Sequence, residues 1–298
     1  LSRSPMERRT IFGGRLLPVL FLLPQLVITF FFFLLPAGKA IYGSFTATDA
    51  FGLHTRFVGL ANFIAIFNDA GYQAALARTA IFCVLVTLLA MALALLFAVF
   101  ADHEIRGRAI YRTLLIWPYA VAPAVSAVLW VFMMNPEVGI IGRELRYLGI
   151  HWDYTVNGMQ ALGLVIVASA WTQVSYNFVF YLAGLQSIPS SVIEAARMDG
   201  AGGFRRFRTI VLPLLMPTTF FLLIVNLVYA AFDTFGTIMA LTRGGPGQST
   251  VTLVVKVYRD GVINLDLAGS SAQSVVLMVL VIGLTAVQFR FLGQRTLS

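Results

Sequence analysis

The sequence of 298 residues is 59% hydrophobic and only 11% charged, with a formal net charge of +8. A soluble domain carries about 25% charged residues, so this composition excludes an ordinary water-soluble protein and predicts an integral membrane protein. The basic residues are mostly arginines in loops between apolar runs, the pattern that orients membrane proteins, so no nucleic-acid partner is expected. The single cysteine, Cys83, allows no intrachain disulfide, and the three histidines lack metal-ligand spacing, so no metal site is expected.

Six apolar runs reach the roughly 20 residues that a helix needs to cross a bilayer. In chain order these runs are Leu16–Gly38, Thr79–Ala101, Thr113–Met134, Gln160–Leu182, Pro213–Leu241 and Leu267–Phe289. The first run is too long, and its flanks are too basic, for a cleaved signal peptide. The sequence therefore predicts an all-α integral membrane protein with six transmembrane helices, the first over 16–38 after an N-terminal segment 1–15.

The basic residues divide unevenly between the two sets of segments that these runs separate. If the N-terminus lies in the cytoplasm, thirteen of the 21 Lys and Arg residues fall inside and the other eight fall outside. Because an excess of Lys and Arg marks cytoplasmic loops, we expect both termini and the polar segment 183–212 to be cytoplasmic. The outer segments 39–77, 135–158 and 242–266 are expected to be folded caps.

The polar segment 183–212 has a local pattern of its own. It predicts a short helix from Ser191 to Met198, a glycine-rich turn that includes Gly200, and a basic stretch leading into a membrane helix that starts at Pro213. A helix of two or three turns is marginal alone in water, so this one needs a partner surface.

The residues of this segment have a recognisable spacing. They are Glu194, Ala195, Ala196, Gly200, Ile210, Leu212 and Pro213. The spacing resembles the EAA signature of permease subunits of binding-protein-dependent ABC importers; an ordinary amphipathic loop helix is the alternative. The resemblance implies the type I importer permease (MetI-like) fold, with a core of five membrane helices over 79–292 and a cytoplasmic coupling helix. The coupling residues that it implies are Glu194, Ala195, Ala196, Asp199 and Gly200.

The same resemblance implies a set of partners. These are a second permease of the same family, two copies of an ATP-binding subunit, an extracytoplasmic solute-binding protein and membrane lipid. A phosphate-binding loop requires Gly-x4-Gly-Lys followed by Ser or Thr, and neither Lys39 nor Lys256 lies in that context. We therefore expect a transport subunit with no catalytic residue and no cofactor of its own, with ATP and Mg²⁺ bound by the partner ATPase.

Longer stretches of the sequence indicate a particular branch of this family. Residues 115–124, 174–178, 185–189, 226–230 with 232–235, and 271–278 together resemble the sn-glycerol-3-phosphate branch of this family. The resemblance implies a multi-pass protein of the bacterial inner membrane that forms half of the translocation pathway. Its solute would be sn-glycerol-3-phosphate or a related glycerophosphodiester such as glycerophosphocholine. An importer for another small polyol or sugar is the alternative.

Polar side chains inside the apolar runs are costly in lipid, so we expect them to face the protein interior. Asn226, Tyr229 and Asp233 fall on one helical face, and by resemblance that face lines the translocation pathway. The other candidates for the pathway are Gln173, Tyr176, Asn177, Gln273 and Ser274, and Thr172 and Ser175 add polarity to the same run as the first three. Hydrogen bonding between helices is the alternative role for all of them.

The expected solute and the expected pathway fit poorly in one respect. A phosphate ester is usually met by Arg, Lys or helix N-termini, and no Arg or Lys lies inside a predicted span. Asp233, the only ionisable residue well inside a span, would repel a phosphate. We therefore hypothesise that Asp233 accepts hydrogen bonds from glycerol hydroxyls or meets a cationic head group, and that the phosphate is handled elsewhere.

Two other functional classes are less consistent with the sequence. An ion-coupled secondary transporter needs relays of intramembrane ionisable residues and usually inverted repeats, and this chain has one such Asp and no obvious repeat. A membrane-embedded lipid transferase needs convergent His, Asp, Glu or Cys residues, which the sequence does not show.

Overall fold

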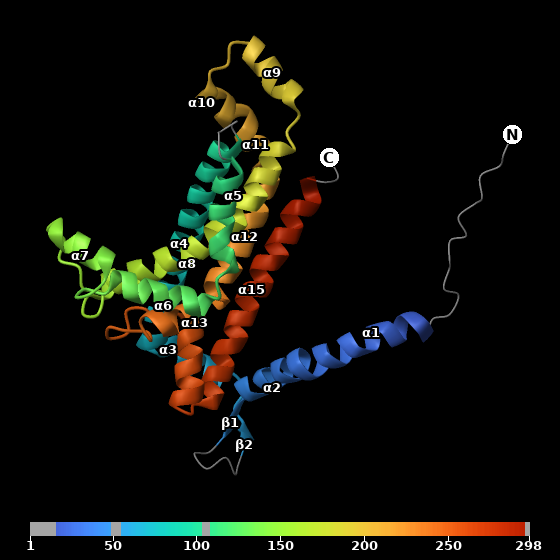
Figure 1. Ribbon diagram of the computed structural model, residues 1–298. Coiled ribbons are helices and arrows are strands. Elements are labelled where there is room, and N and C mark those ends of the chain that lie inside the picture. Colours follow the sequence, from blue (N-terminus) through green and yellow to red (C-terminus); the bar gives the residue numbers. More distant parts are fainter. Residues whose placement is uncertain (1–15, 49–54, 103–107, 296–298) are drawn as a thin grey trace.

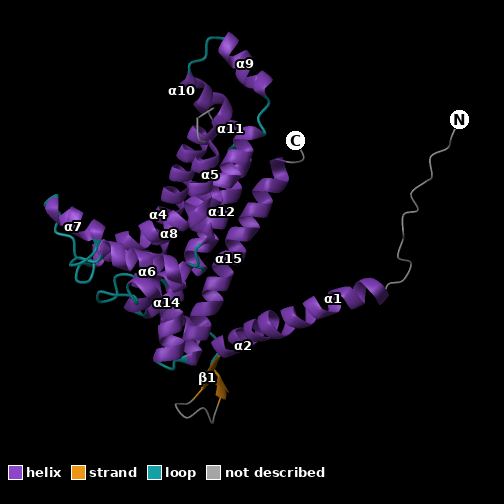
Figure 2. Ribbon diagram, in the orientation of Figure 1, coloured by secondary structure: helices purple, strands orange, loops and turns teal. Residues whose placement is uncertain are grey.

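A computed structural model describes residues 16–48, 55–102 and 108–295 of the chain. The described part is almost entirely helical (Figures 1 and 2). Its first half comprises α1 (Leu16–Thr29), a π-helical turn (Phe30–Leu34), α2 (Leu35–Ser44), β1 (Thr46–Thr48), β2 (Thr55–Phe57), α3 (Ala61–Asn68), α4 (Ala70–Asp102), α5 (Arg108–Ile116), a 3₁₀ turn (Trp117–Ala120), α6 (Pro123–Met134) and α7 (Ile140–Tyr147).

The second half contains the polar loop and the remaining membrane helices. It comprises α8 (Gly158–Gln186), α9 (Ser190–Met198), α10 (Gly203–Arg206), a π-helical turn (Phe207–Val211), α11 (Leu212–Leu214), α12 (Met216–Phe232), α13 (Phe235–Leu241), α14 (Leu253–Tyr258), a second π-helical turn (Arg259–Ile263) and α15 (Leu267–Arg295). The all-α prediction therefore needs one amendment, an antiparallel pair of three-residue strands in which Thr46 faces Phe57.

Four of the six predicted spans are continuous helices. They correspond to Val19–Ser44, Ala70–Asp102, Gly158–Gln186 and the apolar part of α15, Leu267–Val287. In the described residues, six spans are obtained when each of two bent helix pairs is counted as one crossing.

The predicted spans Thr113–Met134 and Pro213–Leu241 are bent helix pairs and not continuous helices. The third predicted span is interrupted by the 3₁₀ turn. Its two parts, Ile110–Ala120 and Pro123–Met134, meet at a bend of 104°. Proline lacks an N–H and restricts the residue before it, so Pro118 and Pro123 break the helical ladder there. The fifth bends by 67° at Leu215, so Pro213 does not start the long helix; α12 begins at Met216 and ends at Phe232.

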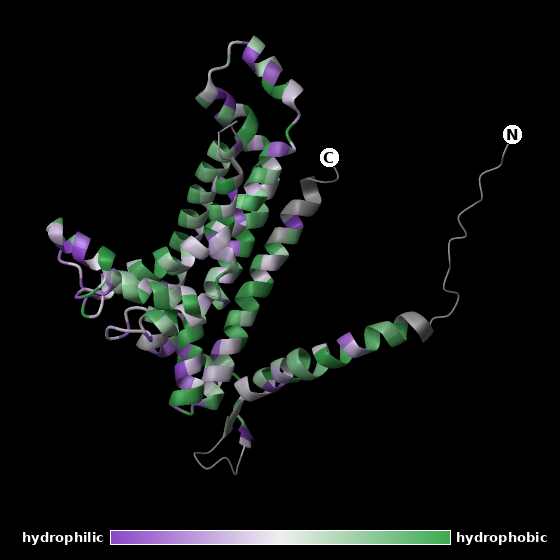
Figure 3. Ribbon diagram, in the orientation of Figure 1, coloured by the Kyte–Doolittle hydropathy of each residue, from purple (hydrophilic) through white to green (hydrophobic). Residues whose placement is uncertain are grey.

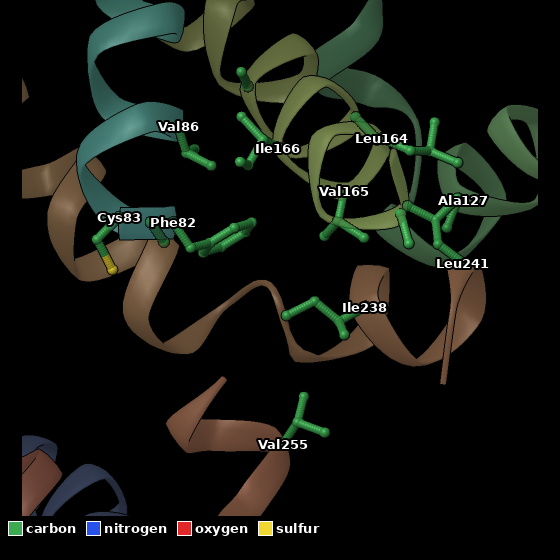
Figure 4. Packing of buried hydrophobic residues seen from close by; sticks show 14 of the residues in the cluster. Phe82, Cys83, Val86, Ala127, Leu164, Val165, Ile166, Ile238, Leu241 and Val255 are labelled. Atoms are coloured by element: carbon green, nitrogen blue, oxygen red, sulfur yellow. The ribbon is translucent and has the colours of Figure 1, made fainter. Parts of the chain in front are cut away.

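α4 and α8 pack side by side at the centre of the bundle (Figure 1). Small residues of α4 recur every three or four positions on the buried face, at Ala90, Ala94, Ala98 and Ala101. Small side chains let two helices approach closely in a membrane. Towards the other end of α4, larger side chains fill the core, where Phe82 packs with residues of α8, α13 and α14, and Cys83 lies in the same cluster (Figure 4).

The first membrane helix stands apart from this bundle. The run from α1 to α2 projects away from the other helices, and none of its apolar window is buried (Figures 1 and 3). Only its last part touches the bundle, where α2 contacts α15 and Gly43 lies close against Ser271. An apolar helix that is exposed all round requires a lipid or protein environment.

At the end of the bundle opposite α9, an ionic network joins α3, α14 and α15. Lys256 Nζ lies 3.1 Å from Asp69 Oδ2 and 3.0 Å from Asp260 Oδ2, and Gln273 donates to Asp260 Oδ2 at 2.7 Å. Burial alone would lower the pKa of Lys256, but its hydrogen bonds with Asp260 and Asp69 outweigh burial and raise the pKa above 10.5. Burial would likewise raise the pKa of Asp69, but the bond and charge of Lys256, together with the backbone N–H groups of Gly71 and Tyr72, outweigh it and leave the pKa below 3.8.

We expect Lys256→Met to destabilise the protein, because it leaves two carboxylates beside each other without their shared cation. Charged hydrogen bonds contribute about 2 kcal/mol, so the melting temperature of the purified protein should fall by several degrees. Lys39→Met, at an exposed position of α2, is the matched control. The raised pKa of Lys256 makes its contribution present below pH 10.5, and the lowered pKa of Asp69 makes its contribution present above pH 3.8. Equal melting curves for the two variants at pH 7 would contradict this role.

Candidate translocation cavity and coupling loop

An open cavity of about 480 Å³ lies where the broken third span meets α8 and α12. Its lining residues are Pro118, Tyr119, Val121, Pro123, Thr172, Gln173, Tyr176, Ile224, Val225, Val228, Tyr229, Asp233 and Thr285. The break at Pro118–Pro123 supplies one wall, so the same prolines that end α5 also shape the cavity. Among the described residues, no Lys or Arg lines this cavity.

Four of the eight predicted pathway residues are brought together at this cavity, namely Gln173, Tyr176, Tyr229 and Asp233. Asp233 is the residue that caps the C-terminus of α12, and its side chain is exposed. Between described residues, its carboxylate has no hydrogen bond or ion pair. Tyr176 lies next to Tyr119 with a ring-centroid distance of 5.9 Å. The cavity therefore combines one unpaired carboxylate with three phenol rings.

Sequence reasoning did not assign Thr172 or Tyr119 to the pathway. Thr172 Oγ1 lies 2.9 Å from the hydroxyl of Tyr229 and donates to the carbonyl of Ser169 at 2.8 Å. The polarity of Thr172 within an apolar run could have indicated a place in the pathway. The sequence around Tyr119 gives no such indication, because its place in the cavity depends on the angle of the bend between α5 and α6.

Asn226 does not share the cavity face with Tyr229 and Asp233. Its side chain is fully buried between α12 and α8, where it exchanges two hydrogen bonds with Asn177, at 3.0 and 2.7 Å. Asn226 also donates to the carbonyl of Leu222 at 2.7 Å. Asn226 is therefore not brought to the cavity with Tyr229 and Asp233, because one helical turn covers an arc wide enough to face both α8 and the cavity.

Gln273 and Ser274 also lie outside the cavity lining. Gln273 is buried and belongs to the ionic network at the opposite end from α9, through its bond to Asp260. Ser274 donates to the carbonyl of Ser270, one turn earlier in α15. The hydrogen bonds of both residues fit the alternative role in helix packing.

The polar loop projects from the other end of the bundle as α9 and α10 (Figure 1). α9 spans Ser190–Met198 and confirms the short helix expected from Ser191 to Met198. Gly200 has a φ of +74°, its N–H donates to Arg197, and the N–H of Ala201 donates to Ala196. This is the Schellman geometry, in which a left-handed residue after the helix satisfies the last carbonyls.

The signature residues differ in exposure. Glu194, Ala195 and Asp199 are exposed, whereas Ala196 is buried at 5% exposure. An open cavity of about 550 Å³ separates α9 and α10 from the ends of α4 and α8, and Glu194 and Arg197 are among its lining residues. α9 thus exposes a carboxylate, Glu194, and a small side chain, Ala195. Within the described residues, no cluster of three or more His, Cys, Asp or Glu could hold a metal.

Comparison with known proteins assigns the chain to a class. Residues 90–297 match the model of the family described as binding-protein-dependent transport system inner membrane component, and the chain belongs to this family. It is a transport subunit of a multi-pass inner-membrane importer that works with binding-protein and ATPase partners, and ATP hydrolysis is carried out by a separate subunit.

Relatives within the family are similar over nearly the whole chain. The sn-glycerol-3-phosphate transport system permease protein UgpA of Rhizobium meliloti is 57% identical, covering 97% of this chain and 98% of the relative. The proteins of the same name from Brucella suis and Yersinia enterocolitica are 58% and 56% identical. They cover 97% and 94% of this chain, and 98% and 95% of their own lengths. The expected family and branch are thereby confirmed.

Solved structures confirm the expected fold. A chain of a bacterial alginate ABC transporter in complex with a pentasaccharide-bound periplasmic protein superposes with a TM-score of 0.79 at 20% identity. The match covers 92% of this chain and 93% of that one. A second structure of a bacterial ABC transporter that imports alginate gives a TM-score of 0.76 at 22% identity, covering 92% and 96%.

Removing one member of the buried asparagine pair should destabilise the protein more than removing both. Asn177→Leu leaves the amide of Asn226 buried without the amide of Asn177, which costs about 1–3 kcal/mol. Asn226→Leu leaves the amide of Asn177 buried without its partner in the same way. In the double variant Asn177→Leu/Asn226→Leu, no amide is stranded between the helices. Thermal unfolding of the four proteins measures this coupling as a double-mutant cycle. Additive losses would show that the pair does not act as a unit.

Proposed function

We propose that this chain is a permease subunit of an importer for sn-glycerol-3-phosphate. The observation that supports this proposal most directly is the 57% identity, over nearly the full length, to a relative named for that transport system. Related glycerophosphodiesters, including glycerophosphocholine, are further candidate solutes, because they share the glycerol hydroxyls and the phosphate.

The cavity between the broken third span, α8 and α12 is this chain's part of the solute pathway. Tyr176, Tyr229, Gln173 and Asp233 are the proposed solute contacts, since all four line it. Asp233 accepts hydrogen bonds from the hydroxyls of the solute, because its carboxylate has no partner among the described residues. Asn226, Asn177, Gln273 and Ser274 contribute instead to helix packing, through the hydrogen bonds described above.

The loop at α9 is proposed to couple this chain to ATP hydrolysis. Glu194, Ala195, Ala196, Asp199 and Gly200 form the docking element for an ATP-binding subunit, which holds ATP and Mg²⁺. The exposed carboxylate of Glu194 suits a basic partner surface, and the small side chain of Ala195 permits close approach. The complex contains a second permease, two ATP-binding subunits and an extracytoplasmic solute-binding protein, and α9 and both termini face the cytoplasm.

Asp233→Asn tests the cavity. A charged hydrogen bond contributes about 1.5–3 kcal/mol, so uptake of labelled sn-glycerol-3-phosphate by proteoliposomes holding the whole complex should fall about tenfold or more. The control is Asp153→Asn, a carboxylate outside the cavity lining whose hydrogen bonds to Thr155 an amide oxygen can keep. Unchanged uptake by Asp233→Asn would remove Asp233 from the solute pathway.

Gly200→Ala tests the coupling loop. No atom lies within 4 Å of the added Cβ, so the cost comes from the left-handed φ of +74° alone and is about 1–2 kcal/mol. We expect loss of the turn after α9, with severalfold weaker uptake and weaker solute-stimulated ATP hydrolysis. Gly202→Ala is the matched control, because Gly202 has a φ of −61° and equally open surroundings. Equal activity of the two variants would show that the shape of this turn is not needed for coupling.

A further inference from the structure

The neighbouring Thr172 fixes the direction in which the hydroxyl of Tyr229 donates its proton. A Thr hydroxyl carries one proton and two lone pairs. Thr172 donates its proton to the carbonyl of Ser169 at 2.8 Å, so the 2.9 Å contact with Tyr229 requires that Tyr229 be the donor. The only proton of Tyr229 is thereby directed at α8, and the lone pairs of its oxygen remain for the cavity that Tyr229 lines.

Asp233 lies one helical turn further along α12 and lines the same cavity. An ionised carboxylate accepts hydrogen bonds and donates none. The wall formed by α12 therefore presents two acceptors at consecutive turns, Tyr229 and Asp233. The hydroxyls of Tyr119 and Tyr176 and the amide of Gln173, which can donate, lie on the walls formed by the 3₁₀ turn and α8.

A wall with two acceptors and no cation selects a donor-rich part of a solute. A phosphate dianion has only acceptor oxygens at neutral pH and is bound by Arg, Lys or backbone N–H groups. The described part of the chain contributes no Lys or Arg to the lining of this cavity. Vicinal hydroxyls, in contrast, each carry a proton and can donate to acceptors spaced along one helix face.

We infer that α12 of this chain binds the hydroxyl end of the solute, with Tyr229 and Asp233 as acceptors and Thr172 as the positioning residue that directs the proton of Tyr229 away from the cavity. The cationic contact for the phosphate comes from outside this chain. This inference rests on the proposed function, and it adds the orientation of the solute and the role of Thr172.

The test compares sn-glycerol-3-phosphate with two phosphates that each lack one hydroxyl, propane-1,2-diol 1-phosphate and propane-1,3-diol phosphate. Uptake of all three is measured in proteoliposomes that contain the whole complex and its binding protein. Tyr229→Phe removes one acceptor, and Thr172→Val frees Tyr229 to donate into the cavity. One neutral hydrogen bond corresponds to about a three- to tenfold preference, so both variants should reduce by that factor the preference for sn-glycerol-3-phosphate over at least one analogue.

Thr172→Ser keeps the hydroxyl and should retain the preference of the unaltered complex. Thr87→Val is the control, because it removes a buried hydroxyl of α4 that has no hydrogen-bond partner among the described residues and lies outside the cavity lining. The preference is a ratio taken within each variant, so reduced assembly lowers both uptakes and leaves the ratio intact. The binding protein's own selectivity cancels between variants because that protein is unchanged.

The outcomes separate the two proposals. If Tyr229→Phe and Thr172→Val transport sn-glycerol-3-phosphate with unchanged preferences, the inferred orientation is wrong and the proposed function stands. If Thr172→Ser behaves like Thr172→Val, the hydroxyl of Thr172 does not set the preference, which also overturns the inference. If the unaltered complex takes up no sn-glycerol-3-phosphate, the proposed function itself fails.

Discussion

The need to satisfy every polar group inside the bilayer determines where this protein places its cavity. Within hydrocarbon, non-helical backbone is tolerated only where it is buried in protein or lines a water-filled space. The chain interrupts its third span between α5 and α6 and ends α12 at Phe232, just before Asp233, and both interruptions border the same cavity. The breaks that would be costly towards lipid thus occur where a polar solute and water can meet the freed groups.

The long helices and the polar loop could be predicted from sequence because their determinants are local. Uninterrupted apolar runs identify α4, α8 and α15, and the glycine turn after α9 depends on a few adjacent residues. Pro118 and Pro123 indicated that the third span was irregular, but the bend of 104° follows from how α6 packs against α13 and α8, which periodicity does not encode.

The cavity was only half predictable because its geometry depends on distant contacts. Asn226 and Tyr229 are one turn apart, and both are polar, yet one pairs with Asn177 across 49 positions and the other with Thr172 across 57. Helical spacing identifies a polar arc on α12 but does not divide it between a neighbouring helix and an open cavity. The position of Asp233 at the cavity was easier to predict, because an ionisable residue near the end of a membrane helix is costly anywhere except next to an aqueous space.

The same two contacts join the two helices that flank the proposed coupling loop. The loop with α9 and α10 is continuous with α8 at one end and with α11 and α12 at the other, so a partner that moves it acts on both helices. α8 and α12 are joined by the asparagine pair and by the bond from Tyr229 to Thr172, two side-chain contacts at separate levels. Residues 117–134 meet α8 through ring contacts instead, Tyr119 with Tyr176 and Trp130 with Trp171. Ring contacts tolerate sliding better than directional hydrogen bonds, so the wall formed by the broken third span is held to α8 less rigidly than α12 is.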